Sequence, residues 1–265
     1  RLYLRRFWQY EEDVRNAVER RLAMSATRQA ALPPDVLRHI LDGLFSPAPA
    51  GEAGTDWQKI ACALAARSSF SILTGGPGTG KTTTVVRLLA LLQALALAAP
   101  SAGGPPRPLR IRLAAPTGKA AVRLNESIAG TVARLPLAGL EHAEAVRAAI
   151  PVKVSTLHRL LGSRPDTRHF RHHADNPLAL DVLVIDEASM VDLEMMAAVL
   201  AALPPAARLI LLGDKDQLAS VEAGAVLGEL CRHARAGHYT PATRDWLATA
   251  TGERIDATLV DEAGG

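Results

Sequence analysis

Residues 75–84 have the sequence GGPGTGKTTT, which indicates both a type of fold and a first function to consider. Gly75, four further residues, Gly80, Lys81 and Thr82 fit the pattern G-x-x-x-x-G-K-[ST]. The glycines let backbone N–H groups turn inward around phosphates at a helix N-terminus, where the helix dipole favours anions. Lys81 would reach the β- and γ-phosphates, and the Thr82 hydroxyl would ligate Mg²⁺. We therefore expect a nucleotide site that includes Gly75, Gly76, Pro77, Gly78, Thr79, Gly80, Lys81, Thr82 and Thr83.

The sequence around this loop alternates between strand-length and helix-length patterns. SFSILT at 69–74 precedes the loop and a helical pattern over 81–98 follows it. This is the context that the phosphate-loop motif requires, and an ordinary glycine-rich turn is the weaker alternative. Further apolar runs of strand length lie at 109–115, 179–185 and 208–212, and further helical patterns at 118–130, 139–149 and 192–202. Such alternation predicts an α/β fold with a central parallel sheet covered on both faces.

The patterns also divide the chain into segments. Apolar spacing predicts one helix from Leu4 and another after Pro33 and Pro34, so we expect residues 1–45 to be a small, separate helical element. The stretch SPAPAGEAGT at 46–55 has no periodicity and is typical of a linker. Residues 56–236 then form the α/β domain, with a surface loop at 97–108. We expect 237–265 to be a weakly structured tail, in which a short strand at Thr258–Val260 is the alternative.

Composition limits the class of protein. A hydrophobic content of 48% excludes a disordered chain, and a net charge of +3 permits a polyanionic partner without requiring one. Cys62 and Cys231 are too few for a disulfide framework or a zinc site, so a reduced cytosolic setting is expected. The apolar run 85–99 is interrupted by Arg87 and Gln93, and we expect no membrane span. Because the chain opens on Arg1 without a methionine, we expect it to be a piece of something longer.

A pair of acids follows the apolar run that ends at Ile185. Asp186, at the tip of the predicted strand, would hold Mg²⁺ through its water shell, and Glu187 could polarise the attacking water. An acidic pair after a strand is otherwise usually a solvated loop. Together with the phosphate loop, the presence of Glu187 favours hydrolysis over simple nucleotide binding.

Two glutamines are candidates for contacts with the nucleotide. Gln217, in GDKDQL at 213–218, lies where it could hydrogen-bond the γ-phosphate or its water, although a strand-to-helix turn built from Gly and Asp is the alternative. Gln58, in DWQK at 56–59, lies at the start of a helix with Thr55 or Asp56 as N-cap. Gln58 could recognise an adenine edge, and Trp57 could flank the base or only pack.

Two further segments follow strands and start helices with hydrogen-bond donors. In APTGKAA at 115–121 these are Thr117, the Gly118 backbone and Lys119, and VSTLHR at 154–159 offers a similar set. Each alone would be an N-cap with a surface cation, but two of them at one sheet edge suggest a track for a nucleic-acid backbone. The stretch Arg168–His173 has no cysteine or suitably spaced acid, so a basic loop or hairpin is favoured over a metal site.

Taken together, GGPGTGKTTT, APTGKAA, STLHRLLG, VIDEASM and GDKDQLASVEAGAVLG, in this order, closely resemble the RecD family of superfamily 1 DNA helicases. RLYLRRFWQYE at the start and DWQK before the phosphate loop extend the likeness over most of residues 1–235. The resemblance implies a RecA-like first motor domain of a 5′–3′ helicase that uses ATP and Mg²⁺ in the bacterial cytoplasm. It also implies single-stranded DNA and RecC- and RecB-type subunits as partners.

The resemblance carries residue roles onto matching positions. Lys81, Glu187 and Gln217 would be catalytic, and Thr82 and Asp186 would hold the metal. Single-stranded DNA would be gripped by Pro116, Thr117, Gly118, Lys119, Thr156 and His158.

The chain departs from the family pattern after Leu218. Helicases of this family hydrolyse ATP between two RecA-like domains, and the second supplies arginines, but the chain ends at Gly265, too soon for another domain. We therefore expect ATP binding with poor hydrolysis. One alternative is a nucleotide- and partner-binding module without turnover. Another is a stand-alone RecD-like helicase that works without RecB and RecC, which the match of the first 45 residues disfavours.

Overall fold

A computed structural model describes residues 5–45, 54–76, 78–98, 106–164, 167, 169–215, 226–232 and 238–261. Its centre is a five-stranded sheet in the order β1-β5-β4-β2-β3, in which every pairing is parallel. The strands are β1 (Phe70–Thr74), β2 (Ile111–Ala115), β3 (Val154–Thr156), β4 (Val182–Ile185) and β5 (Arg208–Gly213). The expected α/β fold with a central parallel sheet is confirmed. Because the strands are parallel, the loops after all of them meet at one edge of the sheet.

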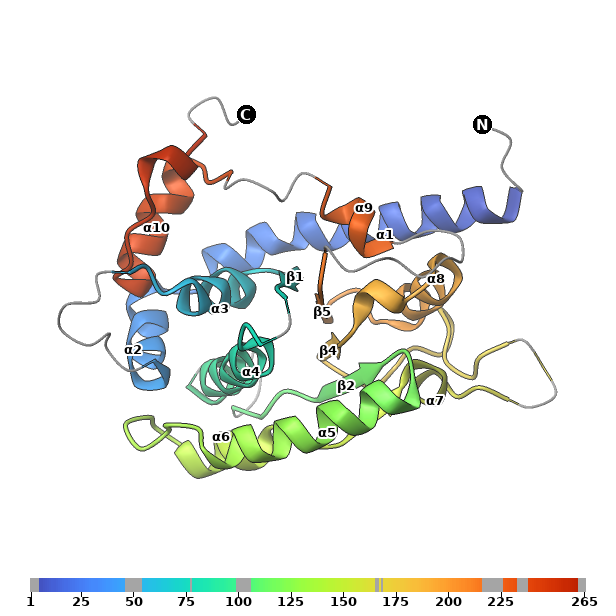
Figure 1. Cartoon of the computed structure of the whole chain (residues 1–265), viewed down its shortest axis with the longest axis horizontal. Coiled ribbons are helices and arrows are strands. Elements are labelled where there is room, and N and C mark those ends of the chain that lie inside the picture. The colour runs from blue at the N-terminus through green and yellow to red at the C-terminus, as the bar shows by residue number, and fades with distance from the viewer. Residues whose placement is uncertain are drawn as a thin grey trace.

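Helices cover both faces of this sheet (Figure 1). In Figure 1 the strands lie in the middle, with α3 and α4 on one side and α8 on the other. Alternate residues of each strand point to opposite faces, so Val182 and Val184 join the core under α4, whereas Leu183 and Ile185 join the core under α8. The helices are α1 (Arg5–Ala30), α2 (Pro34–Leu44), α3 (Trp57–Arg67), α4 (Lys81–Ala98), α5 (Gly118–Ala133), α6 (Ala143–Ala149), α7 (Leu157–Leu161), α8 (Leu193–Ala202), α9 (Val226–Leu230) and α10 (Pro241–Thr251).

Helix α4 is the central helix of one core. By length and composition alone it could cross a membrane. In the fold, its residues from Thr84 to Ala94 are buried, apart from the half-buried Arg87, and they pack against α2, α3, α5 and α6. A helix that is apolar nearly all round is expected inside a protein core, and here the core accounts for the apolar run.

The first helices are part of these cores, which corrects the expectation of a separate element at 1–45. Helix α1 packs along α8 and contributes Val14, Ala17 and Val18 to the second core. Helix α2 contributes its apolar face, including Leu37 and Leu41, to the first core. Their apolar spacing predicts the helices but does not identify the surface that each one covers. Residues 46–53 of the expected linker lie outside the described residues.

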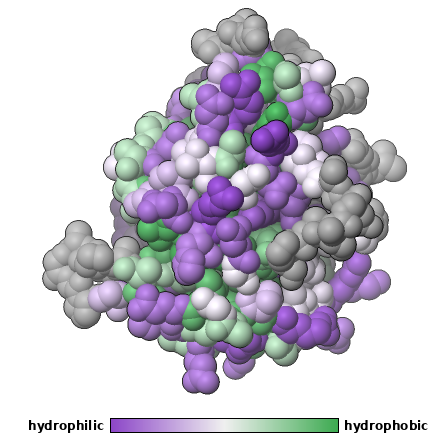
Figure 2. Space-filling view, turned by 90° about the vertical axis from the view of Figure 1, so that its left-hand side faces the viewer, coloured by the Kyte–Doolittle hydropathy of each residue, from purple (hydrophilic) through white to green (hydrophobic). Residues whose placement is uncertain are grey.

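The segment after residue 237 is also more ordered than expected. Thr240 caps α10, which packs on α2 and α3, and the guanidinium of Arg67 lies 4.4 Å from the ring centroid of Trp246. The possible strand at Thr258–Val260 is instead the 3-10 helix η2 (Ala257–Leu259), with an isolated bridge between Tyr239 and Val260. Figure 2 shows the side that carries α2 and α10, where hydrophilic residues predominate and apolar ones form small separate groups. This side is therefore typical of a solvated surface over a buried core.

Other differences concern short elements. β3 has three residues, too few for a periodic pattern, and its pairing of Thr156 with Ala115 of β2 makes it a strand. The helix expected at 139–149 begins at Ala143, after His142 in the left-handed region at φ 59°. The strands expected at 69–74, 109–115, 179–185 and 208–212 and the helices expected at 81–98, 118–130 and 192–202 lie within three residues of the observed bounds. No range was expected for α7 or α9.

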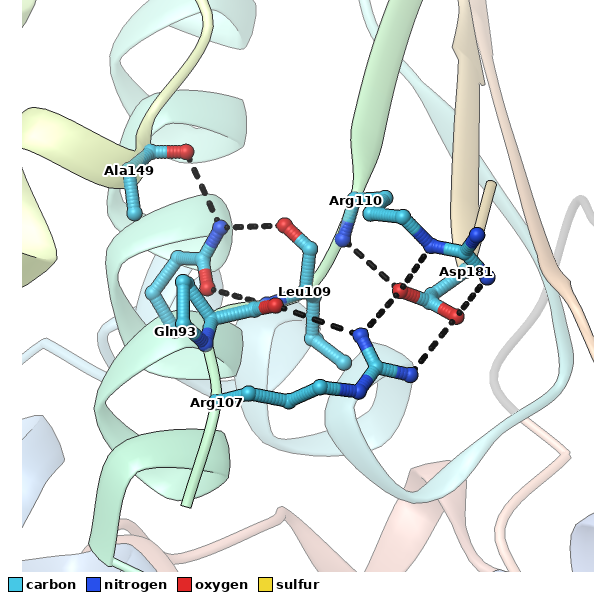
Figure 3. Close-up of polar contacts among 7 residues, drawn as sticks. Gln93, Arg107, Leu109, Arg110, Ala149 and Asp181 are labelled. Atoms are coloured by element: carbon cyan, nitrogen blue, oxygen red, sulfur yellow. Dashed lines mark hydrogen bonds and ion pairs between the residues drawn. The ribbon is translucent and has the colours of Figure 1, made fainter. Parts of the chain in front are cut away.

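Polar contacts hold the edge of the sheet opposite the phosphate loop (Figure 3). The buried amide of Gln93 accepts from the Leu109 backbone N–H at 2.8 Å and donates to the carbonyls of Leu109 and Ala149 at 3.0 Å each. Asp181, just before β4, accepts from the Arg110 backbone N–H at 2.8 Å and from the guanidiniums of Arg107 and Arg110. These bonds join α4, α6 and two neighbouring strands.

Asp181 makes stability depend on acid pH. Burial by itself raises the pKa of Asp181, but the hydrogen bonds from Arg110 and Arg107 outweigh that effect and hold the pKa well below its usual range. The folded state therefore binds fewer protons than the unfolded state, in which this pKa is about 3.9. The stabilisation is present above about pH 4 and is lost as the pH falls toward the folded-state pKa.

We expect Asp181→Asn to lower the free energy of unfolding by about 1 kcal/mol near neutral pH, a value kept small because both guanidiniums are half exposed. The difference from wild type should shrink by about pH 3, measured by urea denaturation at both pH values. Asp175→Asn, at a carboxylate that is 96% exposed, is the control and should change little. If Asp181→Asn lowered the free energy of unfolding equally at both pH values, the charge of the Asp181 carboxylate would not be what stabilises the fold.

Candidate nucleotide-binding site

The loop between β1 and α4 has the backbone shape of a phosphate-binding loop. Gly78 and Gly80 lie in the left-handed region at φ 78° and 81°, which side chains other than glycine rarely adopt. Thr79 closes the turn through its hydroxyl, which donates to the Gly76 carbonyl at 2.9 Å. A Cβ on Gly75 would lie 2.6 Å from that hydroxyl, so the close turn also needs glycine there.

Lys81 is at the first position of α4, and its ammonium lies inside the loop. Nζ donates to the carbonyls of Gly75 and Gly76, the second at 2.9 Å. An ammonium has three donors and no acceptor, so these contacts place a positive charge where the N-terminus of α4 already favours an anion. Thr82 and Thr83 follow on the same helix turn. Both line a cavity that Lys81 also lines and that is described below.

The acidic pair lies at the end of β4. The Asp186 backbone N–H donates to the Ala114 carbonyl at 2.9 Å, and β4 also pairs with β5. Glu187 has φ 51°, in a region that residues other than glycine seldom occupy. Such strain is concentrated at functional sites. This turn directs the chain into η1 (Ala188–Met190), and both acids line the cavity that contains Lys81.

The environment of Asp186 changes its proton affinity. Burial raises the pKa of Asp186, and the Glu187 charge adds to this effect. The Glu187 backbone hydrogen bond, Lys81 and Arg123 act in the opposite direction. The net effect is a raised pKa for Asp186. This is expected for a buried carboxylate that has no bound cation beside it.

Gln58 connects the preceding helix to the loop. Asp56 caps α3 by accepting from the backbone N–H groups of Gln58 and Lys59 at 3.0 Å each. This cap places Gln58 in the first turn, where Nε2 donates to the Thr79 carbonyl at 3.3 Å. Trp57 beside it is 49% exposed. The structure therefore brings Gln58 to the phosphate loop, and its contact with adenine stays a prediction.

Lys81, the rest of the described loop from Gly76 and the acidic pair border one cavity of about 540 Å³ at the carboxyl edge of the sheet, and Gln58 lies beside the loop without lining this cavity. The loop, the acidic pair and the first three turns of α5 contribute to its wall. Several of its lining residues were not among the predicted site residues, including Arg123, Ser127 and Met190. Arg123 and Ser127 follow Lys119 at intervals of four, which puts all three on one face of a helix. That spacing was the available signal, and it has meaning only once α5 is known to border the cavity.

The donor set suits a hard divalent cation such as Mg²⁺. The Thr82 hydroxyl and the Asp186 carboxylate are oxygen donors on two walls of the same cavity. Mg²⁺ is usually held by one or two carboxylates together with substrate phosphates and water. Among the described residues, no group of three or more His, Cys, Asp or Glu side chains could hold a metal ion by itself. The residues thus fit a metal that arrives with a phosphate ligand.

The residues predicted to bind DNA divide into two places. Thr117 and Lys119 line the nucleotide cavity, whereas Thr156 and His158 lie at the end of β3 outside it. Both threonines act as N-caps: Thr117 Oγ1 accepts from Ala120 N and Thr156 Oγ1 from Arg159 N, each at 3.2 Å. Pro116 and Gly118 complete the turn into α5. His158 is exposed and packs edge-on against Phe170, so DNA contact stays a prediction.

Two predicted site residues, Pro77 and Gln217, lie outside the described residues, and so does Arg168 of the basic stretch. The described end of β5 still reaches the site, because Gly213 accepts from the Gly75 backbone N–H at 3.3 Å and Asp214 lines the cavity.

The rest of the basic stretch borders a different cavity. Residues 169–173 line a space of about 560 Å³ with Tyr10 and Asp13 of α1 and Glu194 of α8. His173 and Asn176 form an antiparallel bridge, which makes this segment a tight turn. The stretch is therefore separate from the nucleotide cavity.

Comparison with known proteins finds a matching family model and several relatives. The model of a family described as an AAA domain matches residues 58–223, which include the phosphate loop, the acidic pair and α5. RecBCD enzyme subunit RecD of Haemophilus influenzae is 45% identical over 257 residues, which is 97% of this chain and 38% of that protein. The subunit of the same name from Mycolicibacterium smegmatis is 49% identical over 86% of this chain and 37% of its own length.

A relative with a different name shares less of the chain. The ATP-dependent RecD2 DNA helicase of Deinococcus radiodurans is 42% identical over 163 residues, or 62% of this chain and 18% of that protein. Against the two RecD subunits above, the chain spans a little over a third of the relative's length.

Proposed function

Because the chain belongs to the AAA domain family and is similar to RecD subunits over most of its length, we propose that it is the first motor domain of an ATP-dependent 5′–3′ DNA helicase subunit. The complex would be an exonuclease of the RecBCD type that acts in double-strand break repair and recombination in the bacterial cytoplasm. RecB- and RecC-type subunits would be its partners.

The observation that carries this proposal is the convergence of three kinds of group in one cavity. Lys81 and the loop N–H groups supply positive charge from one strand end, and Asp186 and Glu187 supply carboxylates from another. Lys119, on a third strand end, adds a cation that the sequence assigns to DNA. Phosphoryl transfer depends mainly on positioning and charge stabilisation, and this arrangement supports the proposal because it would supply both.

The residues that line the cavity would have different roles in ATP hydrolysis. Lys81 would exchange the carbonyls of Gly75 and Gly76 for phosphate oxygens, so its charge would be available as negative charge develops. Thr82 and Asp186 would hold Mg²⁺, which neutralises phosphate charge when bound. Glu187 would orient the attacking water and accept its proton.

Helix α5 offers a physical link between nucleotide and DNA. Its N-terminal turn carries the predicted DNA groups Thr117 and Lys119, and its next turn carries Arg123 toward Asp186. A rigid helix that borders both ligands can move in response to either one. This arrangement supports a motor in which nucleotide turnover and DNA grip depend on each other.

The proposal predicts strong binding and weak turnover by this chain. ATP with Mg²⁺ should bind, but steady-state hydrolysis should be about 10³- to 10⁵-fold slower than in the assembled enzyme, because arginines from a second motor domain contribute that much in related reactions. Single-stranded DNA should stimulate it little. The measurements are ATP titration and phosphate release with and without oligo(dT), for the chain alone and for the complete subunit with its RecB and RecC partners.

Three outcomes would count against the proposal. Failure to bind ATP would contradict the nucleotide site. Fast, DNA-stimulated hydrolysis by the chain alone would contradict a motor that needs a second domain. A complete subunit that unwinds DNA without associating with RecB- or RecC-type proteins would support the stand-alone helicase instead.

A further inference from the structure

Arg87 lies between the phosphate loop and the first core, on the second turn of α4. Its guanidinium carbon lies 4.5 Å from the ring centroid of the buried Phe45, at the end of α2. Nη1 donates to Gln58 Oε1 at 3.4 Å. Within the described part of the chain Arg87 forms no ion pair. The Arg87 guanidinium therefore contacts the face of the Phe45 ring and donates to the Gln58 side-chain amide.

The contacts on both sides of Gln58 determine which way its amide points. A guanidinium has only donors and a peptide carbonyl only accepts, so Oε1 must face Arg87 and Nε2 must face the Thr79 carbonyl. Turning the amide over would place its NH₂ against the guanidinium donors and its oxygen against the carbonyl. Gly80 allows this close approach, since a Cβ there would lie 2.6 Å from Nε2.

The amide that is held in this way keeps one free donor hydrogen and one free acceptor position. Adenine presents an amino donor and a ring-nitrogen acceptor side by side, which matches this pair, whereas guanine presents two acceptors on the same edge. In either orientation of the amide, guanine would gain one hydrogen bond and meet one acceptor–acceptor repulsion, whereas adenine gains both bonds only in the orientation that the contacts hold. The bond from Arg87 keeps the amide from turning over.

We propose that Arg87 is a positioning residue that fixes the orientation of the Gln58 amide and so makes the site prefer adenine over guanine nucleotides. The inference rests on the nucleotide-binding function proposed above. Arg87 would not touch the nucleotide but would act through Gln58.

The test is the ratio of dissociation constants for ATP and GTP, measured with Mg²⁺ on the whole chain. Wild type should prefer ATP by about 5- to 150-fold, the range that a bidentate contact to one base provides. In Arg87→Met the side chain keeps an unbranched apolar stem against Phe45 but loses its donors, and the preference should fall by about 3- to 10-fold. Arg87→Lys keeps a donor cation and should retain most of the preference.

Two further variants separate positioning from packing. Arg87→Gln carries an amide that can donate or accept, so it should also lose selectivity, and it replaces Arg87→Met if that variant does not fold. In the Gln58→Ala background, Arg87→Met should have no further effect on the ratio.

The outcomes distinguish this inference from the function on which it rests. Equal weakening of ATP and GTP in Arg87→Met would overturn the inference, because a structural role would affect both nucleotides alike. A wild-type chain that binds both nucleotides equally would overturn it while leaving the nucleotide site intact. A wild-type chain that binds neither would overturn the proposed function as well.

Discussion

Replacement of Lys81 by alanine is expected to weaken ATP binding by at least about tenfold and to abolish measurable hydrolysis. The ammonium is the only side-chain cation inside the described part of the phosphate loop. A hydrogen bond to a charged group contributes about 1.5–3 kcal/mol, so the loss of even one bond to phosphate costs about tenfold or more. The change is measured by titration with a fluorescent ATP analogue in the presence of Mg²⁺.

The matched control for this prediction is Lys153→Ala. Lys153 is exposed and precedes β3, at the edge of the sheet opposite the phosphate loop. The Lys153→Ala substitution removes the same charge at a distance from the site, so the ATP affinity should stay at the wild-type value. Thermal unfolding of both variants checks that the loss of the Lys81 bonds to Gly75 and Gly76 does not unfold the chain. Wild-type affinity in Lys81→Ala would refute the assignment of the loop.

Replacement of Glu187 by glutamine should separate binding from chemistry. Glutamine has nearly the same shape but cannot accept the proton of the attacking water, and a general base contributes about 10²- to 10⁴-fold to a rate. We expect hydrolysis to slow by that factor while ATP affinity is retained, because Lys81 and the loop are unchanged. A single-turnover experiment with excess protein over labelled ATP detects the slow rate of this chain.

Glu126→Gln is the control for this second prediction. Glu126 lies on α5 with an exposed side chain that does not line the nucleotide cavity. It removes the same charge from a helix that borders the site, so the rate should not change. If Glu187→Gln hydrolyses ATP at the wild-type rate, another group orients the water, and Asp186 with its raised pKa becomes the next residue to test.

Much of the site could be predicted from the sequence because its parts are local. The phosphate loop needs glycine at positions of unusual φ and a lysine at the helix start, and these requirements are met within six consecutive residues, 75–80, and Lys81. The acidic pair needs only a buried strand before it. Likewise, the apolar patterns were sufficient for four of the five strands of the parallel sheet, all but β3. The resemblance to the RecD family, which these motifs carried, is confirmed by relatives that are 45–49% identical.

The placement of whole helices could not be predicted in the same way. An apolar face shows that a helix packs against something. From the sequence alone, α1, α2 and α10 could each have packed against another protein or another domain instead of the two cores of this fold. The expected tail was wrong for this reason, since α10 is held by contacts such as that of Trp246 with Arg67, which is far away in sequence.

The residues of the candidate phosphate loop are evident from the sequence alone, because that chemistry is encoded in adjacent positions with strict backbone requirements. Which distant residues also border the cavity depends on the tertiary structure. Arg123 reaches the cavity because α5 crosses its wall, and Arg87 meets Gln58 because α3 packs on α4. Contacts between residues far apart depend on how elements pack, and an arginine on a helix has no local feature that reveals its partner.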